Sequence, residues 1–180
     1  MDGENRQAVV QVWAEDEARF GLQPILRKVW AKVGRRPLVE VNPHYEWFWS
    51  YGAVCPKSGE SFFLVLPNLQ ASSVEIFLRE FAKAQGVGEE KKIVLMCDGA
   101  PGHRSQLKVP EGIELVSFPA YTPELNPSER LWSPLKESVA NRNFKSIIEM
   151  EDVVIQAMNN LSKDKEALSS LTNYHWLSSL

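Results

Sequence analysis

The sequence predicts an α/β domain in which helices flank a mixed central sheet. Three segments rich in strand-forming residues, 8–17, 46–54 and 61–66, precede the first helix, which indicates a meander of antiparallel strands. An amphipathic segment at 72–86 then leads to the apolar run 93–98, and a helix in that place is typical of a crossover between parallel strands. The two patterns together favour a sheet with both kinds of pairing.

Length and composition indicate one domain over residues 1–180. The chain is 44% hydrophobic and 24% charged, which suffices for a large core. Its net charge of -3 argues against a surface that binds nucleic acid everywhere, but allows a local basic patch. Cys55 and Cys97 lie in separate apolar segments, as buried thiols of a reducing compartment do. Without a signal peptide or an apolar run of membrane-spanning length, we expect a cytoplasmic protein with no membrane partner.

The first predicted strand, 8–17, ends in three acidic residues. Period-two alternation places Val12, Ala14 and Asp16 on one face, and this face is the more apolar one. Asp16 is therefore a candidate site residue. The alternative is a solvated strand end of no special function.

Residues 21–37 form an irregular basic segment that contains no acid. Its cations surround Trp30, so the segment is a candidate for contacting phosphates and stacking on a base. The alternative is a solvated hairpin that Trp30 anchors to the core. The candidate DNA-binding residues here are Arg27, Lys28, Trp30, Lys32, Arg35 and Arg36.

The later elements follow from capping signals and periodicity. The spacing from Ser72 to Glu75 is that of a capping box, and the helix that follows should end at Gly86. A further strand is expected at 113–118, and helices at 127–141 and 147–161. The tail, with Tyr174, Trp176 and Leu177, is expected to dock on the core or on a partner.

Two more acids occupy the ends of predicted elements. Asp98 follows the apolar run 93–97, where a carboxylate needs a cation, hydrogen bonds or water. Glu129 stands three positions after Asn126, which with Pro127 is a typical helix start, so that Glu129 either caps its own backbone or projects towards the strand ends. For Asp98 the alternative is an ordinary turn residue.

Three carboxylates at the ends of elements would suit a hard cation. Oxygen ligands favour Mg²⁺ or Mn²⁺, whose shells water and substrate oxygens complete. Two such ions can activate the attacking oxygen and stabilise the leaving oxygen of a phosphodiester. No pairing of Cys with His offers a zinc site.

At these residues the chain resembles the DDE-type transposases of bacterial insertion sequences in the mariner-like superfamily, whose catalytic domain has an RNase H-like fold. The resemblance implies that Asp16, Asp98 and Glu129 form the catalytic, metal-binding triad; Asp98 and Glu129 are 31 positions apart (129 − 98). Gly99 and Ser128 depart from the family pattern without removing a ligand. The segments that carry the resemblance are 15–20, Arg27 with Trp30, 94–98 with His103, and 119–129 with Leu131, Trp132 and Lys136.

The resemblance also implies an activity and partners. The implied activity is metal-dependent cleavage and strand transfer at transposon ends, with two Mg²⁺ or Mn²⁺ ions. The implied partners are the DNA of the transposon ends and of the target. The resemblance also implies a homodimer that assembles on DNA in the cytoplasm, at the bacterial nucleoid. His103 and Arg104 are further candidates for a phosphate contact. The family's N-terminal helix-turn-helix modules are not seen before residue 8. Alternatives are an RNase H-like nuclease that does not join strands, and a domesticated remnant that only binds DNA or protein.

Overall fold

The computed structural model describes residues 8–35, 38, 44–98, 107–119 and 122–174. A five-stranded sheet in the order β3-β2-β1-β4-β5 forms its centre. Pairing is antiparallel among β1, β2 and β3 and parallel among β1, β4 and β5, which confirms the predicted mixed sheet and meander. The elements are β1 Val9–Gly21, β2 Trp47–Cys55, β3 Glu60–Leu66, α1 Ala71–Gln85, β4 Lys91–Cys97, β5 Ile113–Ser117, the 3-10 helices η2 Pro123–Leu125 and η3 Pro127–Leu131, α2 Trp132–Val139, α3 Ile147–Lys163 and α4 Lys165–Thr172.

Strand β1 is longer than the sequence predicts. Its first part pairs with β4 as far as Ala14, and from Ala14 to Gly21 it pairs with β2. The predicted strand end at residue 17 is therefore wrong, because the antiparallel ladder with β2 continues to supply backbone partners. Asp16 consequently lies within a strand and not at its mouth.

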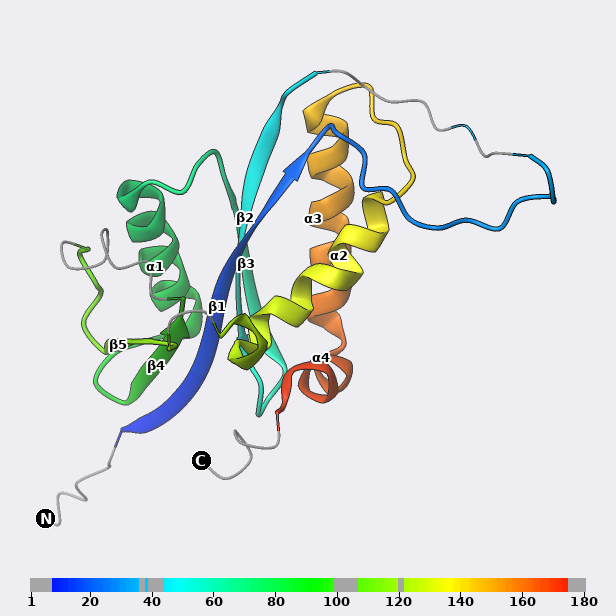
Figure 1. Cartoon of the computed structure of the whole chain (residues 1–180). Helices are drawn as coiled ribbons and strands as arrows, with labels where there is room; N and C mark the ends of the chain where they lie inside the picture. Colours follow the sequence, from blue (N-terminus) through cyan, green and yellow to red (C-terminus); the bar gives the residue numbers. More distant parts are fainter. Residues whose placement is uncertain (1–7, 36–37, 39–43, 99–106, 120–121, 175–180) are drawn as a thin grey trace, which may run out of the picture.

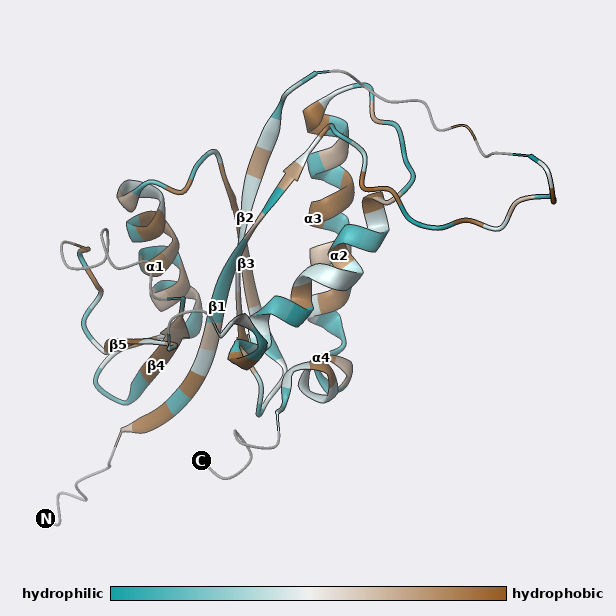
Figure 2. Ribbon diagram, viewed as in Figure 1, coloured by the Kyte–Doolittle hydropathy of each residue, from teal (hydrophilic) through white to brown (hydrophobic). Residues whose placement is uncertain are grey.

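Helices cover both faces of the sheet (Figure 1). On one face Phe77 and Phe81 of α1 pack against Trp13 and Tyr51, with Trp13 edge-on to Phe81 at 5.0 Å. On the other face α2 and α3 pack against the second half of β1. In Figure 2, hydrophobic colour marks the start of β1 and much of β4, while the middle of β1 is hydrophilic. Each buried large side chain contributes roughly 1.5–3 kcal/mol, so these two apolar layers hold the sheet in place.

Helix α1 does not begin with the predicted capping box. Its N-cap is Gln70, whose side chain makes no capping hydrogen bond. Instead Ser73 Oγ donates to Asn68 Oδ1 at 2.8 Å, and Glu75 accepts from the backbone N–H of Lys108. The predicted end is confirmed, since Gly86 adopts the left-handed conformation that glycine tolerates best.

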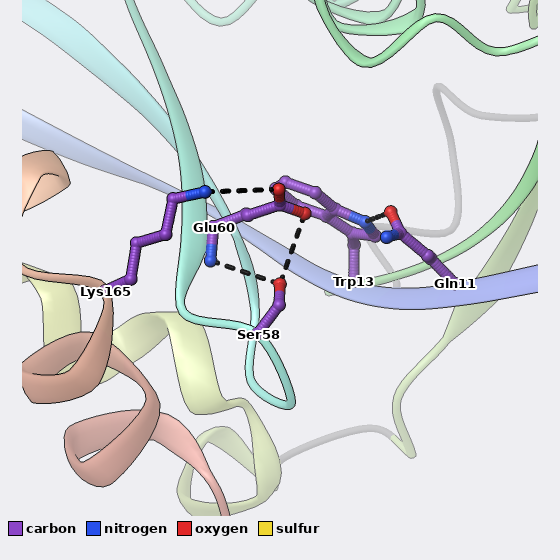
Figure 3. A network of polar contacts seen from close by, with 5 residues as sticks. All are labelled: Gln11, Trp13, Ser58, Glu60 and Lys165. Carbon is purple, nitrogen blue, oxygen red and sulfur yellow. Dashed lines mark hydrogen bonds and ion pairs between the residues drawn. The ribbon is translucent and has the colours of Figure 1, made fainter.

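The last helix among the described residues, α4, is not predicted from the sequence. Lys165 Nζ lies 3.3 Å from Glu60 Oε1, and Ser58 donates to the same carboxylate (Figure 3). At Gly59 a Cβ would lie 1.8 Å from the carbonyl oxygen of Lys165, so only glycine fits this turn. Tyr174 stacks on Arg130, in agreement with a docked tail, while Trp176 and Leu177 lie outside the described residues.

Two further expectations concern the cysteines and the membrane. Cys55 and Cys97 are both buried, as predicted. None of the helices in the described ranges is long and apolar enough to cross a membrane.

Candidate active site

Asp16 is the most deeply buried acid of the predicted triad. It lies opposite Gly52 of β2 and on the same face of β1 as Ala14 and Ala18, beneath η3 and α2. Only 7% of its surface is exposed. The indole Nε1 of Trp132 donates a 2.5 Å hydrogen bond to its Oδ2.

The environment of Asp16 disfavours the ionised form of its carboxyl group. Burial raises the pKa of Asp16 from its ordinary 3.8 to about 7; the Trp132 hydrogen bond opposes the rise and the negative charge of Glu129 adds to it. A carboxylate in this position is stabilised by any cation that binds beside it. Perturbed acids of this kind are frequent at functional sites.

Asn126 fastens the turn that carries Glu129 to the same strand. Its Nδ2 donates to the backbone oxygen of Glu15 at 3.1 Å, while its Oδ1 accepts from the backbone N–H and the hydroxyl of Ser128. The predicted N-cap at Asn126 and the proline in the first turn are confirmed. The predicted helix 127–141 is a 3-10 turn followed by α2, which ends at Val139.

Glu129 is exposed, and its charge acts on Asp16. Among the described residues no hydrogen bond joins its carboxylate to the backbone of its own helix. The alternative in which Glu129 serves as a capping residue therefore finds no contact in its favour. The side chain is placed instead where its charge reaches the buried aspartate.

Asp98 lies directly after the neighbouring strand, β4. Ala14 pairs with Met96, and Asp16 and Asp98 each stand two positions further along their chains. β4 ends at Cys97, however, so Asp98 is exposed. Within the part of the chain that the structure describes, no three acidic, histidine or cysteine side chains are close enough together to hold a metal ion. The three-carboxylate cluster thus stays a prediction, with the charge of Glu129 acting on Asp16 and with Asp98 directly after the adjoining strand.

The basic segment extends away from the body of the molecule (Figure 1). Trp30 is fully exposed, so the alternative in which it anchors the segment to the core is wrong. Lys28, Lys32 and Arg35 are also exposed, whereas Arg27 bonds Glu137 of α2 through Nε at 2.6 Å. Arg36, His103 and Arg104 lie outside the described residues.

The contact of Trp132 with Asp16 and the role of Gly52 are not predicted from the sequence. Trp132 follows Glu129 by three positions, as Asn126 precedes it by three, and both contact β1. This symmetric spacing, together with the place of Trp132 in the motif that carries the resemblance, is a signal for Trp132. Gly52 gives none, because its partner comes from a distant element.

Solved structures with a similar fold come from DNA transposition and integration. The chain matches the mariner Mos1 paired-end complex with Mg (TM-score 0.60, 18% identical) over 91% of its own length and 56% of the Mos1 chain. The Mos1 strand transfer complex gives a TM-score of 0.56 at 15% identity, covering 91% of this chain and 55% of that one. An intasome of simian T-cell lymphotropic virus gives 0.52 at 14%, covering 80% and 46%. The likeness confirms the predicted RNase H-like fold, and this chain spans little more than half of Mos1.

Sequence comparison agrees with the fold. The chain is 32% identical over 132 residues to the uncharacterized protein y4pE/y4sA of Sinorhizobium fredii (strain NBRC 101917 / NGR234), covering 72% of this chain and 96% of that protein. The family model described as DDE superfamily endonuclease matches residues 11–151, which include Asp16, Asp98 and Glu129. The predicted family and enzyme class are confirmed: the chain belongs to the DDE superfamily endonucleases.

Proposed function

We propose that this chain is the catalytic unit of a transposase, which cuts DNA strands at transposon ends and joins them to target DNA. One observation carries the proposal: the buried Asp16, held by Trp132, shares its surroundings with the charge of Glu129 in a chain of the DDE endonuclease family. Two like charges beside a buried strand are costly unless a cation joins them. The arrangement therefore suits a metal-dependent reaction at a phosphodiester.

The donor set fits Mg²⁺ or Mn²⁺. Asp16, Asp98 and Glu129 offer carboxylate oxygens alone, which these hard cations prefer. We propose that Asp16, Asp98 and Glu129 are the residues that would hold two such ions. Ions bound there would neutralise charge on the phosphate and lower the pKa of the attacking water. The Mos1 paired-end complex named above contains Mg.

DNA would reach the site along the extended basic segment. Lys28, Lys32 and Arg35 provide positive charges for the backbone phosphates, and Trp30 an aromatic surface for a base. Contacts of this kind position DNA without reading its sequence. We therefore propose that transposon ends are recognised by helix-turn-helix modules that act together with this chain, and that two copies assemble on the DNA.

Nicking of supercoiled plasmid by the full chain in Mn²⁺ tests the metal role of Glu129. Glu129→Gln should lower the rate more than about 100-fold, because even outer-shell partners of a metal ligand account for 10–100-fold. Its melting temperature should barely change, since the carboxylate is exposed and caps nothing in the described chain. Glu124→Gln, an equally exposed acid in η2, is the matched control and should nick normally. Normal nicking by Glu129→Gln would remove Glu129 from the metal site.

The products distinguish the proposal from its rivals. A transposase yields a 3′-hydroxyl that becomes joined to a second duplex, whereas a simple nuclease leaves only cut strands. A remnant without activity would bind DNA and cut nothing in either metal. We expect binding by the isolated chain to be weak, indifferent to sequence and steeply weakened by salt. Tight binding of the isolated chain to one particular duplex would contradict the proposal that helix-turn-helix modules recognise the transposon ends.

A further inference from the structure

Trp132 occupies a place shaped to receive its indole ring. It is the first residue of α2 and is only 3% exposed. Its ring lies over Gly52, which is the residue paired with Asp16 across β1 and β2. A Cβ at position 52 would come within 2.8 Å of Cη2 of Trp132 and 3.1 Å of the ring of Phe63. Absence of a side chain at position 52 is therefore what allows the indole to reach Asp16.

The N–H of this ring holds one oxygen of the carboxylate. Trp132 Nε1 donates to Oδ2 of Asp16 at 2.5 Å in a buried setting. An indole is a donor only, so the acceptor must be the carboxylate. The backbone N–H of Glu17 also donates to this carboxylate, and the lone pairs that remain would serve an ion. Hydrogen bonds that orient a ligand in this way are a regular part of metal sites.

The same contact also controls where Glu129 lies. Asn126 and Trp132 stand three positions to either side of Glu129 and bond consecutive residues of β1, Glu15 and Asp16. The turn that carries Glu129 is thus tied to the strand at both of its ends. Loss of either tie would change the separation of the two acids.

We propose that Trp132 is a positioning residue of the metal site: its indole N–H orients the Asp16 carboxylate and sets the place of Glu129 relative to it. This inference rests on the proposed function, since it concerns ligands of the same ions. It adds a residue that contacts neither the ion nor the DNA. The consequence is a measurable effect on metal affinity that packing alone would not produce.

Trp132→Phe removes the donor while keeping an aromatic ring, and Trp13→Phe is its matched control. Trp13 is fully buried on the opposite face of β1, and its Nε1 donates to Gln11 Oε1 at 3.0 Å (Figure 3). The two variants should lower the melting temperature by similar amounts, because each replaces a buried indole with a smaller phenyl ring and removes a hydrogen bond. Only Trp132→Phe should weaken Mn²⁺ binding to the full chain, by about 10-fold or more, as measured by electron paramagnetic resonance of the free ion.

An NMR measurement tests the contact without any metal. In ¹⁵N-labelled chain, the indole N–H signal that disappears in Trp132→Phe belongs to Trp132. This signal should move upfield in Asp16→Ala, while the Trp13 signal stays in place. An unchanged Trp132 signal would show that the hydrogen bond does not exist and would overturn the inference.

A second variant covers the case in which Trp132→Phe does not fold. Gly52→Ala places a methyl group against the indole and should both shift the Trp132 signal and weaken Mn²⁺ binding. Wild-type Mn²⁺ affinity in a folded Trp132→Phe chain, or in a Gly52→Ala chain whose signal has shifted, would overturn the positioning role and leave the proposed function intact. A wild-type chain that binds no Mn²⁺ would overturn the metal site itself, and this inference with it.

Discussion

Asp16 and Asp98 each come two positions after the last residue pair of the adjacent parallel strands β1 and β4, yet their surroundings are opposite. Asp16 is buried and bonded to Trp132, whereas Asp98 is exposed directly beyond the end of β4. The difference arises because β1 continues along β2 for several residues after its pairing with β4 has ended. Helix α2 can therefore pack over Asp16, whereas β4 ends at Cys97, one residue before Asp98.

The comparison shows two ways of presenting a carboxylate. Asp16 is held in place by the protein, and burial of its charge lowers the stability of the fold. Asp98 is exposed to water, so its charge has little effect on stability. Residues poised for function often lower stability in this manner. The two aspartates should therefore respond alike in an assay of activity and differently in one of stability.

The largest expected effect is on cleavage, where the two acids should behave alike. Asp16→Asn and Asp98→Asn each remove a charge from the proposed site, so each should reduce Mn²⁺-dependent nicking by more than about 100-fold. Asp152→Asn, an exposed acid of α3, serves as the control. Full nicking by Asp98→Asn would show that only Asp16 of the two is needed for cleavage and would leave Asp98 as an ordinary turn residue.

The next effect separates the two acids. In metal-free buffer at pH 8, Asp16→Asn should raise the free energy of unfolding by up to about 4 kcal/mol, because a buried charge is removed and the amide oxygen still accepts from Trp132. Asp98→Asn should change it by less than about 0.5 kcal/mol, as for other exposed sites. Urea denaturation of the three chains measures both. Equal changes in the free energy of unfolding for the two variants would show that burial of the Asp16 charge does not destabilise the fold.

The pH dependence of stability sharpens the same contrast. An acid with a pKa of about 7 in the fold and 3.8 in the unfolded chain binds more protons when folded between these values. Stability from this group is therefore fully present below about pH 4, declines as pH rises to about 7, and is constant above. The difference between wild type and Asp16→Asn, measured by urea denaturation across this window, isolates the effect. A difference that does not vary with pH would mean that Asp16 titrates normally.

A smaller effect is expected at Asn126, which ties Glu129 to β1. Asn126→Ala removes the N-cap of η3 and the bond to the Glu15 backbone, and should lower the free energy of unfolding by about 2 kcal/mol. Asn159→Ala, an exposed position in α3, should be near neutral. Thermal and urea unfolding decide the matter. A neutral Asn126→Ala would show that Glu129 is held by packing alone.

Local patterns were sufficient to predict most elements. The alternation in β1, the strand-forming residues of β2 and β3, the apolar run of β4 and the start of η3 at Asn126 are all local patterns. Each of these elements appears in the structure. The three acids and the family were predicted from motifs of the same local kind, and the family model covers them. Local signals failed at the capping of α1 and at α4, where Glu75 bonds Lys108 and Lys165 bonds Glu60 instead.

The sequence by itself determined which residues are candidates for metal binding and catalysis. Only the tertiary structure decided the environment of each of these residues. Nothing in the sequence distinguishes Asp16 from Asp98, because burial depends on how far β1 extends along β2. The same holds for Trp132, whose contact with Asp16 spans 116 positions and requires a glycine at position 52 in a third element. Trp30 likewise is exposed, and the segment that carries it extends away from the body of the molecule in Figure 1. Contacts between distant segments fix burial, and burial fixes the energy of a charge.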